Sequence, residues 1–265
     1  MQSLDIGDLA VLLIEPSCTQ AKIIQDQLKG QGVEKIDTAA TGRDGLSRLA
    51  HYMPDLVISS MYLPDMTAVD LVTRLRTESR YQHLPFVLVS SETRLDELDP
   101  IRQAGVVAIL PKPFEFNDLR RALQNTLQYL EPCEITLESY DVERLRVLLV
   151  DDSRLARRHI KRVLNGMGIE TITEASDGRE AAEILREHEF DLVITDYNMP
   201  KLDGKGLTDF IRNELDNPFL PVILVTSEQN ETRLNAVQQA GVSAICDKPF
   251  EPGNIRSLLY QCLEG

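Results

Sequence analysis

The chain has 265 residues and a formal net charge of −14, which opposes binding to the phosphate backbone of nucleic acids. Hydrophobic residues make up 43% and charged residues 26%, a composition typical of folded domains and not of disordered segments. No apolar run approaches the roughly 18 residues that a membrane-spanning helix requires. We therefore expect globular domains that contact neither nucleic acid nor membrane.

One pattern occurs twice along the chain, at a constant separation of 136 residues. Residues 147–153 lie over 11–17, and residues 191–196 lie over 55–60. The same separation aligns Gly178 with Gly42, Pro200 with Pro64, Thr226 with Ser90, Gly241 with Gly105, and Lys248-Pro249-Phe250-Glu251 with Lys112-Pro113-Phe114-Glu115. A repeat of this length is a duplicated domain, and each copy is long enough to bury its own core. We predict a first domain over residues 1–130, a linker over 131–143 and a second domain over 144–265.

In the first copy, the apolar run at residues 9–14 predicts a strand. The run is too short to cross a membrane, lacks a basic flank and recurs in the second copy. The linker that follows carries five acidic residues without a sustained apolar period, and Pro132 favours a helix end before it.

The second copy alternates four apolar runs with segments of helical periodicity, as expected for a parallel sheet covered by helices on both faces. The runs cover residues 147–150, 192–195, 222–225 and 244–246, and a weaker fifth strand is expected at 170–173. Helical periodicity is clear at residues 155–164, 178–186 and 254–263. Ser153 is a candidate N-cap for the first of these helices.

Polar residues stand directly after these apolar runs: Asp151, Asp152, Asp196, Thr226 and Lys248. An isolated Asp after a strand is usually a turn residue, but five such residues at strand ends predict one pocket at the carboxyl edge of the sheet. Three crowded carboxylates repel one another unless a cation neutralises them. Oxygen ligands without His or Cys favour Mg²⁺. The central Asp196 is the candidate nucleophile toward phosphorus.

The full pattern consists of Asp151-Asp152, Asp196-Tyr197-Asn198-Met199-Pro200 with Asp203-Gly204, Thr226, and Lys248-Pro249-Phe250. Together they resemble two tandem CheY-like receiver domains of the two-component response regulator family, over about residues 7–130 and 144–265. The resemblance implies an α/β fold with two doubly wound five-stranded parallel sheets, one per domain, in the flavodoxin-like strand order 2-1-3-4-5.

For the site, the resemblance implies that Asp196 accepts a phosphoryl group from a phosphohistidine of a sensor histidine kinase or phosphotransfer protein. Asp151, Asp152, Asp196 and the backbone carbonyl of Asn198 would hold Mg²⁺. Thr226 and Lys248 would bind the phosphoryl oxygens, and the Lys248-Pro249 bond would be cis. Ile245 stands where many relatives carry an aromatic switch residue, so an aromatic rotamer is not the expected readout.

The first copy replaces most of these groups. Glu15, Pro16, Ser60 and Ser90 stand for Asp151, Asp152, Asp196 and Thr226, and Lys112 alone matches its counterpart. A serine cannot form the acyl phosphate, and one carboxylate cannot assemble a magnesium site unaided. We predict a pseudo-receiver that serves as an interaction or dimerisation module, with an ion pair between Glu15 and Lys112 in its pocket.

Two further features have a structural and a functional interpretation. The basic residues Arg154, Arg157, Arg158, Lys161 and Arg162 form either a solvated helix face or a docking surface for an acidic partner. His159 lies in the same helix, a place that disfavours a phosphotransfer role.

The four cysteines show no metal-ligand spacing, which indicates a reducing, cytoplasmic compartment.

The leading hypothesis is a signalling protein controlled by phosphorylation, acting through a downstream protein or a second copy of itself. It would be no enzyme beyond its own phosphorylation and slow dephosphorylation. One alternative is the N-terminal receiver part of a longer regulator with a separate output domain. Others are an Mg²⁺-dependent phosphatase with an aspartyl-phosphate intermediate, which Asn198 disfavours because such enzymes usually carry an acid there, and a structural adaptor.

Overall fold

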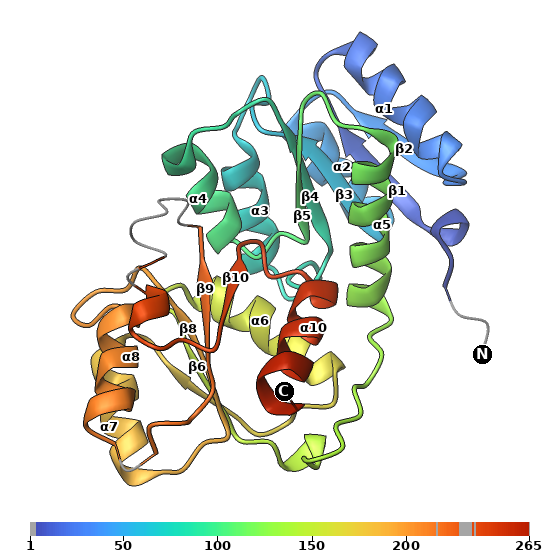
Figure 1. The fold of residues 1–265 in the computed structure, drawn as a ribbon. Helices are drawn as coiled ribbons and strands as arrows, with labels where there is room; N and C mark the ends of the chain where they lie inside the picture. The colour runs from blue at the N-terminus through green and yellow to red at the C-terminus, as the bar shows by residue number, and fades with distance from the viewer. Residues whose placement is uncertain (1–3, 216, 228–234, 236, 265) are drawn as a thin grey trace. The chain divides into compact units, whose positions relative to one another are not determined.

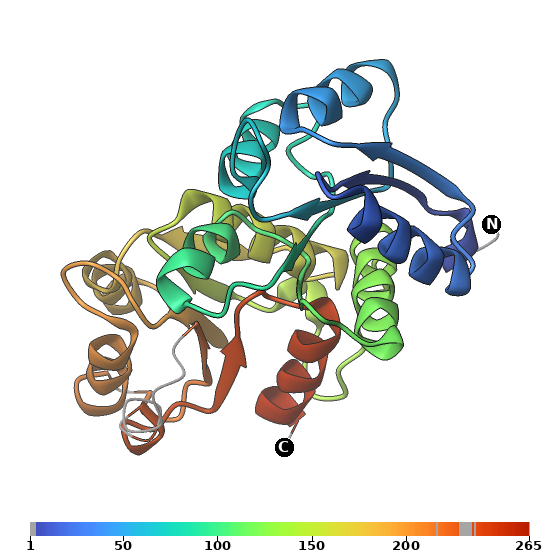
Figure 2. The same ribbon diagram turned by 90° about the horizontal axis from the view of Figure 1, so that it is seen from above.

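Each of the two units of the chain, residues 1–132 and 133–265, is built around one sheet with helices on both faces (Figure 1). A computed structural model describes residues 4–215, 217–227, 235 and 237–264. Figure 2 shows the same elements from above, with the helices of each unit flanking its own strands. Within the described part of the chain, no helix combines the length and the apolar character that a bilayer crossing requires.

The first unit is a five-stranded parallel sheet in the order β2-β1-β3-β4-β5. Its strands are β1 (Ala10–Ile14), β2 (Lys35–Ala39), β3 (Leu56–Ser60), β4 (Phe86–Ser90) and β5 (Ala108–Pro111). Its helices are η1 (Ile6–Asp8), α1 (Cys18–Gly30), α2 (Gly42–His51), α3 (Ala68–Thr77), α4 (Leu95–Gln103) and α5 (Phe116–Leu130).

The second unit repeats this arrangement, with parallel strands in the order β7-β6-β8-β9-β10. Its strands are β6 (Val147–Val150), β7 (Ile172–Ala175), β8 (Leu192–Asp196), β9 (Val222–Thr226) and β10 (Ala244–Asp247). Its described helices include η2 (Val142–Arg144), α6 (Arg154–Gly166), α7 (Gly178–Glu187), α8 (Gly204–Asn213) and α10 (Pro252–Glu264). The predicted α/β class and the strand order 2-1-3-4-5 are confirmed in both units.

Alternation along the central strands sends side chains to both faces of each sheet. In β1, Val11 and Leu13 belong to a core with α1 and α5. Ile14 points to the opposite face, where a Cβ built on Gly45 of α2 would lie 2.5 Å from its Cδ1 atom. In the second unit, one face of the sheet packs against α7 and α8. Burial on both faces explains why the central strands are continuous apolar runs.

The fifth strand of the second unit differs from its expected position. The sequence pattern places it at residues 170–173, whereas β7 covers Ile172–Ala175. β7 is an edge strand, and only Ala175 within it is buried. A strand with so little burial carries no apolar run to mark its ends.

Part of the predicted linker packs against the second unit. Helix α5 ends at Leu130, and the division between the units falls after Pro132. Ile135 and Leu137 are buried while Thr136 between them is exposed, the alternation of an extended segment with one packed face. The backbone N–H of Ile135 donates to the carbonyl of Met167 at 3.0 Å.

We expect Ile135→Ala to destabilise the protein by about 2–4 kcal/mol, because the substitution leaves a cavity beneath an ordered segment. The measurement is urea unfolding followed by circular dichroism. Thr136→Ala, at the exposed neighbour, is the matched control and should change the unfolding free energy by no more than about 0.5 kcal/mol. Equal effects of the two substitutions would show that the segment is only a tether.

Candidate functional site

Four strands of the second unit deliver polar side chains to the same end of the sheet. Asp151 follows β6, Asp196 is the last residue of β8, Thr226 is the last residue of β9, and Lys248 follows β10. Because neighbouring parallel strands end side by side, residues almost a hundred positions apart meet at one edge. The structure thus brings together the acids and the amine that the sequence predicted.

Lys248 is the centre of this site. Its ammonium donates to Asp151 Oδ2 at 3.0 Å and to Asp196 Oδ2 at 2.8 Å. The three residues are 6%, 0% and 3% exposed, respectively. Burial raises the pKa of Asp151 to about 6, helped by the charge of Asp196 and opposed by Lys248. Burial alone would lower the pKa of Lys248, but the two carboxylates outweigh it and raise that pKa.

The turn after β6 fixes the direction of the Asp151 carboxylate. The backbone N–H of Ser153 donates to Asp151 Oδ1 at 2.8 Å, leaving Oδ2 to face Lys248. The Ser153 hydroxyl accepts from the backbone N–H of Ala156 at 3.3 Å and so caps α6, as predicted. One short turn therefore both starts the helix and orients a pocket acid.

The acidic group fits a hard divalent cation. Asp151, Asp152 and Asp196 each offer a carboxylate oxygen, and these oxygens lie within 4.8 Å of one another. Asp152 is exposed, whereas the other two are buried. A set of carboxylate oxygens that opens to solvent on one side suits Mg²⁺, which keeps several waters. Asn198 lies in the turn two residues beyond Asp196, and its carbonyl remains a predicted ligand.

The turn after Asp196 approaches the strand closely. The backbone N–H of Gly204, the first residue of α8, donates to the Tyr197 carbonyl at 3.0 Å. A Cβ at Gly204 would lie 2.3 Å from the carbonyl oxygen of Asp196, so only glycine fits there. The Lys248-Pro249 peptide is cis, as the resemblance implied, and so is Lys112-Pro113. Ile245 is a half-buried residue of the edge strand β10.

The first unit closes the corresponding pocket with an ion pair. Lys112 donates to Glu15 Oε2 at 2.7 Å and to Ser60 Oγ at 3.1 Å, and Ser60 donates to the same Glu15 oxygen. The predicted pairing of Glu15 with Lys112 is therefore confirmed. Burial acts to raise the pKa of Glu15, but its bonds to Lys112, Ser60 and the Ser17 backbone together lower it. The pocket that remains measures about 140 Å³, and its lining includes Glu15, Ser60 and Lys112 together with Pro16 and Ser90.

The basic helix face is less solvated than the sequence suggested. Arg157 and Lys161 both pair with Glu174 of β7, at 3.2 and 2.9 Å. Arg157 also donates to the backbone carbonyl of Asp151, a contact that the run of basic residues in the sequence does not reveal. His159 is buried, with Nε2 3.2 Å from the Phe250 carbonyl, which disfavours a phosphotransfer role.

Comparison with known proteins agrees with this geometry. The family model of the response regulator receiver domain matches residues 11–124 and again residues 147–260. Chemotaxis protein CheY-3 of Vibrio cholerae is 34% identical over 122 residues, which is 46% of this chain and 94% of that protein. Chemotaxis protein CheY of Pseudomonas aeruginosa is 37% identical over 120 residues, 45% of this chain and 97% of that protein.

Among solved structures, the chemotaxis response regulator CheY4 of Vibrio cholerae is 27% identical, with a TM-score of 0.42, over 44% of this chain and 98% of that chain. The signal receiver domain of a signal transduction histidine kinase from Syntrophus aciditrophicus is 24% identical, with a TM-score of 0.44, over 49% of this chain and 98% of that chain. Both halves of the sequence match the same family, and both have the same fold. The chain belongs to the response regulator receiver domain family, as two receiver domains in tandem that serve two-component signalling.

Proposed function

We propose that the second domain is a switch in which Asp196 accepts a phosphoryl group from a phosphohistidine of a sensor histidine kinase or phosphotransfer protein. Phosphorylation then changes the contacts of the domain with a downstream protein or with a second copy of the chain. The first domain lacks the acceptor and acts as an interaction or regulatory module. The four cysteines are free thiols, which supports a cytoplasmic location.

The observation that carries this proposal is the buried bridge from Lys248 to Asp151 and Asp196, with Asp152 beside it. Three carboxylates and one ammonium leave a net charge of −2 in the pocket. A divalent cation held by Asp151, Asp152, Asp196 and the Asn198 carbonyl would balance that charge. When bound, Mg²⁺ supplies a positive centre for the oxygens of the incoming phosphoryl group.

The residues of the chain supply the remaining chemistry. A carboxylate oxygen of Asp196 forms a bond to phosphorus while the bond from phosphorus to the imidazole nitrogen breaks, and that nitrogen keeps the electron pair. The imidazole leaves as a neutral ring because its second nitrogen carries a proton. Lys248, held protonated by its two acids, pairs with the oxygens of the acyl phosphate, and Thr226 donates its hydroxyl to them.

The first domain cannot follow the same path. Ser60 offers a hydroxyl that already donates to Glu15, and Pro16 brings no carboxylate. Glu15 and Lys112 neutralise each other at 2.7 Å, so no net charge calls for a cation. The domain therefore keeps the receiver fold, and we expect it to act through contacts of its surface with other proteins.

Incubation of the full chain with Mg²⁺ and a small labelled acyl phosphate should give one phosphoryl group per chain. Asp196→Asn should abolish the label, because an amide does not form an acyl phosphate. The measurement is the amount of label per mole of chain, which should survive acid and be lost in base. Asp209→Asn, at a partly exposed acid of α8 paired with Lys205, is the matched control and should label like the wild type.

Label that persists in Asp196→Asn would overturn the assignment of the acceptor. Continuous release of phosphate over many turnovers would instead indicate a phosphatase. If no label enters the wild type, and the partner contacts of Asp196→Asn are those of the wild type, the chain is an adaptor.

Glu15→Gln should destabilise the first domain at pH 7 by about 1–3 kcal/mol, because it leaves Lys112 without its charged partner. The folded-state pKa of Glu15 is lowered below the ordinary value of 4.5. Its stabilisation is therefore present above that value and is lost as the pH falls through the folded-state pKa. The difference between wild type and Glu15→Gln should shrink below about pH 4.

Urea unfolding at several pH values measures this difference. Glu34→Gln, at an exposed position of the same domain, is the control and should match the wild type throughout. A Glu15→Gln deficit of the same size at pH 3.5 and pH 7 would contradict a stabilising charge on Glu15.

A further inference from the structure

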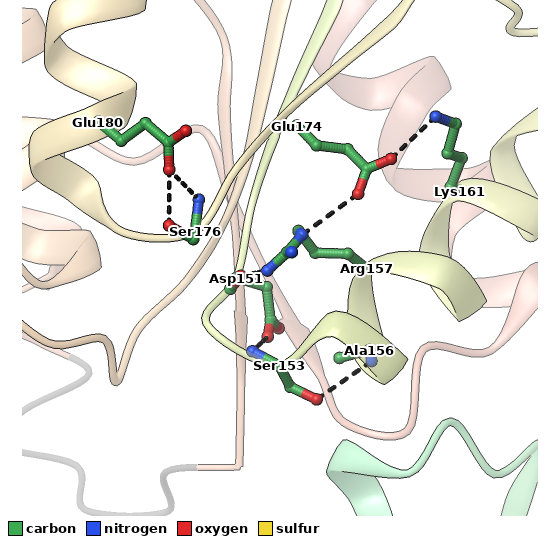
Figure 3. Close-up of polar contacts among 8 residues, drawn as sticks. All are labelled: Asp151, Ser153, Ala156, Arg157, Lys161, Glu174, Ser176 and Glu180. Atoms are coloured by element: carbon green, nitrogen blue, oxygen red, sulfur yellow. Dashed lines mark hydrogen bonds and ion pairs between the residues drawn. The ribbon is translucent and has the colours of Figure 1, made fainter. Parts of the chain in front are cut away.

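Arg157 on α6 joins the end of β6 to the neighbouring strand β7 (Figure 3). Its Nη1 donates to the backbone carbonyl of Asp151 at 2.5 Å, and its Nε donates to Glu174 Oε2 at 3.2 Å. The side chain is only 15% exposed, so the guanidinium is partly buried between these two acceptors. A planar guanidinium is suited to such a task because its donors point in fixed directions.

All the polar groups of Asp151 are held. Its backbone N–H donates to the Ala175 carbonyl at 3.3 Å, and its carboxylate accepts from the Ser153 N–H and from Lys248. The fourth group, the carbonyl, accepts from Arg157. This carbonyl belongs to the planar peptide that leads into Asp152. The direction of the Asp151 carbonyl therefore fixes the peptide plane, and with it the position of the Asp152 Cα atom.

The first unit repeats three of these four contacts. The backbone N–H of Glu15 donates to the Ala39 carbonyl at 3.0 Å, and its carboxylate accepts from the Ser17 N–H at 2.9 Å and from Lys112 at 2.7 Å. At the position that corresponds to the arginine stands Ala21, whose methyl group donates no hydrogen bond. The arginine contact thus distinguishes the acidic pocket from the closed one.

Glu174 and Lys161 complete the arrangement. Glu174 accepts from both Arg157 and Lys161, and these bonds lower the pKa of Glu174. A positive charge beside the acids would repel a bound cation, and Glu174 offsets it. The corresponding residues of the first unit are Thr38 and Gln25, so the whole charged group is confined to the unit with three acids.

We propose that Arg157 is a positioning residue for the cation site of the second domain: by holding the Asp151 carbonyl, it directs Asp152 toward the other two acids, and Glu174 holds it in place. The inference rests on the proposed function, because it concerns the Mg²⁺ that the three acids would bind. In this proposal Arg157 acts through the Asp151 backbone and is a ligand of neither the cation nor the phosphoryl group.

Calorimetric titration of the metal-free full chain with Mg²⁺ tests this role. Arg157→Met keeps most of the packing but removes the donors, and we expect about tenfold weaker binding, the usual effect of losing a group that orients a metal ligand. Arg157→Lys keeps one donor and should recover part of the affinity. The sign is informative, because removal of a positive charge acting through space alone would strengthen the binding of a cation.

Lys161→Met is the matched control. It removes the same charge from the same helix and also loses a bond to Glu174. Lys161 is not one of the groups that hold Asp151 in place. Its Mg²⁺ affinity should stay within about twofold of the wild type, outside the 10- to 100-fold range of orienting groups. Thermal unfolding of each metal-free variant checks that the domain is folded.

Unchanged or tighter Mg²⁺ binding by Arg157→Met would overturn the inference, and so would equal effects of Arg157→Met and Lys161→Met. Labelling of Asp196 in the wild type separates this failure from failure of the proposed function. A wild type that labels at Asp196, beside an Arg157→Met variant with wild-type affinity, removes only the role of Arg157. A wild type that binds no Mg²⁺ removes both.

Discussion

A lysine amine after the last strand, buried in the second domain and partly buried in the first, is the constraint on which both pockets depend. An ammonium taken out of water is costly unless charged partners surround it. In the second domain, Lys248 finds two carboxylates, at the ends of β6 and β8. In the first, Lys112 finds the Glu15 carboxylate and the Ser60 hydroxyl at the corresponding strand ends. In both copies, therefore, the acid that follows the first strand stabilises the charge of the lysine.

Charge balance separates the two pockets more sharply than their fold does. In the first, one carboxylate faces one ammonium, and the hydrogen bond from Ser60 completes a neutral group. In the second, three carboxylates stand near one ammonium, and burial together with the charge of Asp196 raises the pKa of Asp151 in spite of Lys248. One pocket is thus neutral by itself, whereas the acids of the other would be balanced by the divalent cation that we propose.

The parts of the fold that could be predicted from the sequence are those in which burial leaves a repeated pattern. Central strands buried on both faces are continuous apolar runs, so β6, β8 and β9 and the residues after them were located correctly. The edge strand β7 lacks such a run and was misplaced by two residues. Ile135 and Leu137 are two apolar residues in an acidic segment, too few to reveal that the segment packs against a domain.

The contact of Arg157 with Asp151 was beyond the reach of sequence periodicity for a different reason. Helical spacing shows that Arg157 and Lys161 share a face, but it does not show that this face crosses the ends of β6 and β7. Only the packing of α6 on the sheet brings a guanidinium to a backbone carbonyl six residues earlier in the chain. The alignment of the two copies does point to this contact. Ala21, Gln25 and Thr38 replace Arg157, Lys161 and Glu174, and three charged residues that are present together in one copy and absent together from the other are expected to interact with one another. The difference between the two copies therefore extends from the acids themselves to the residues that hold them.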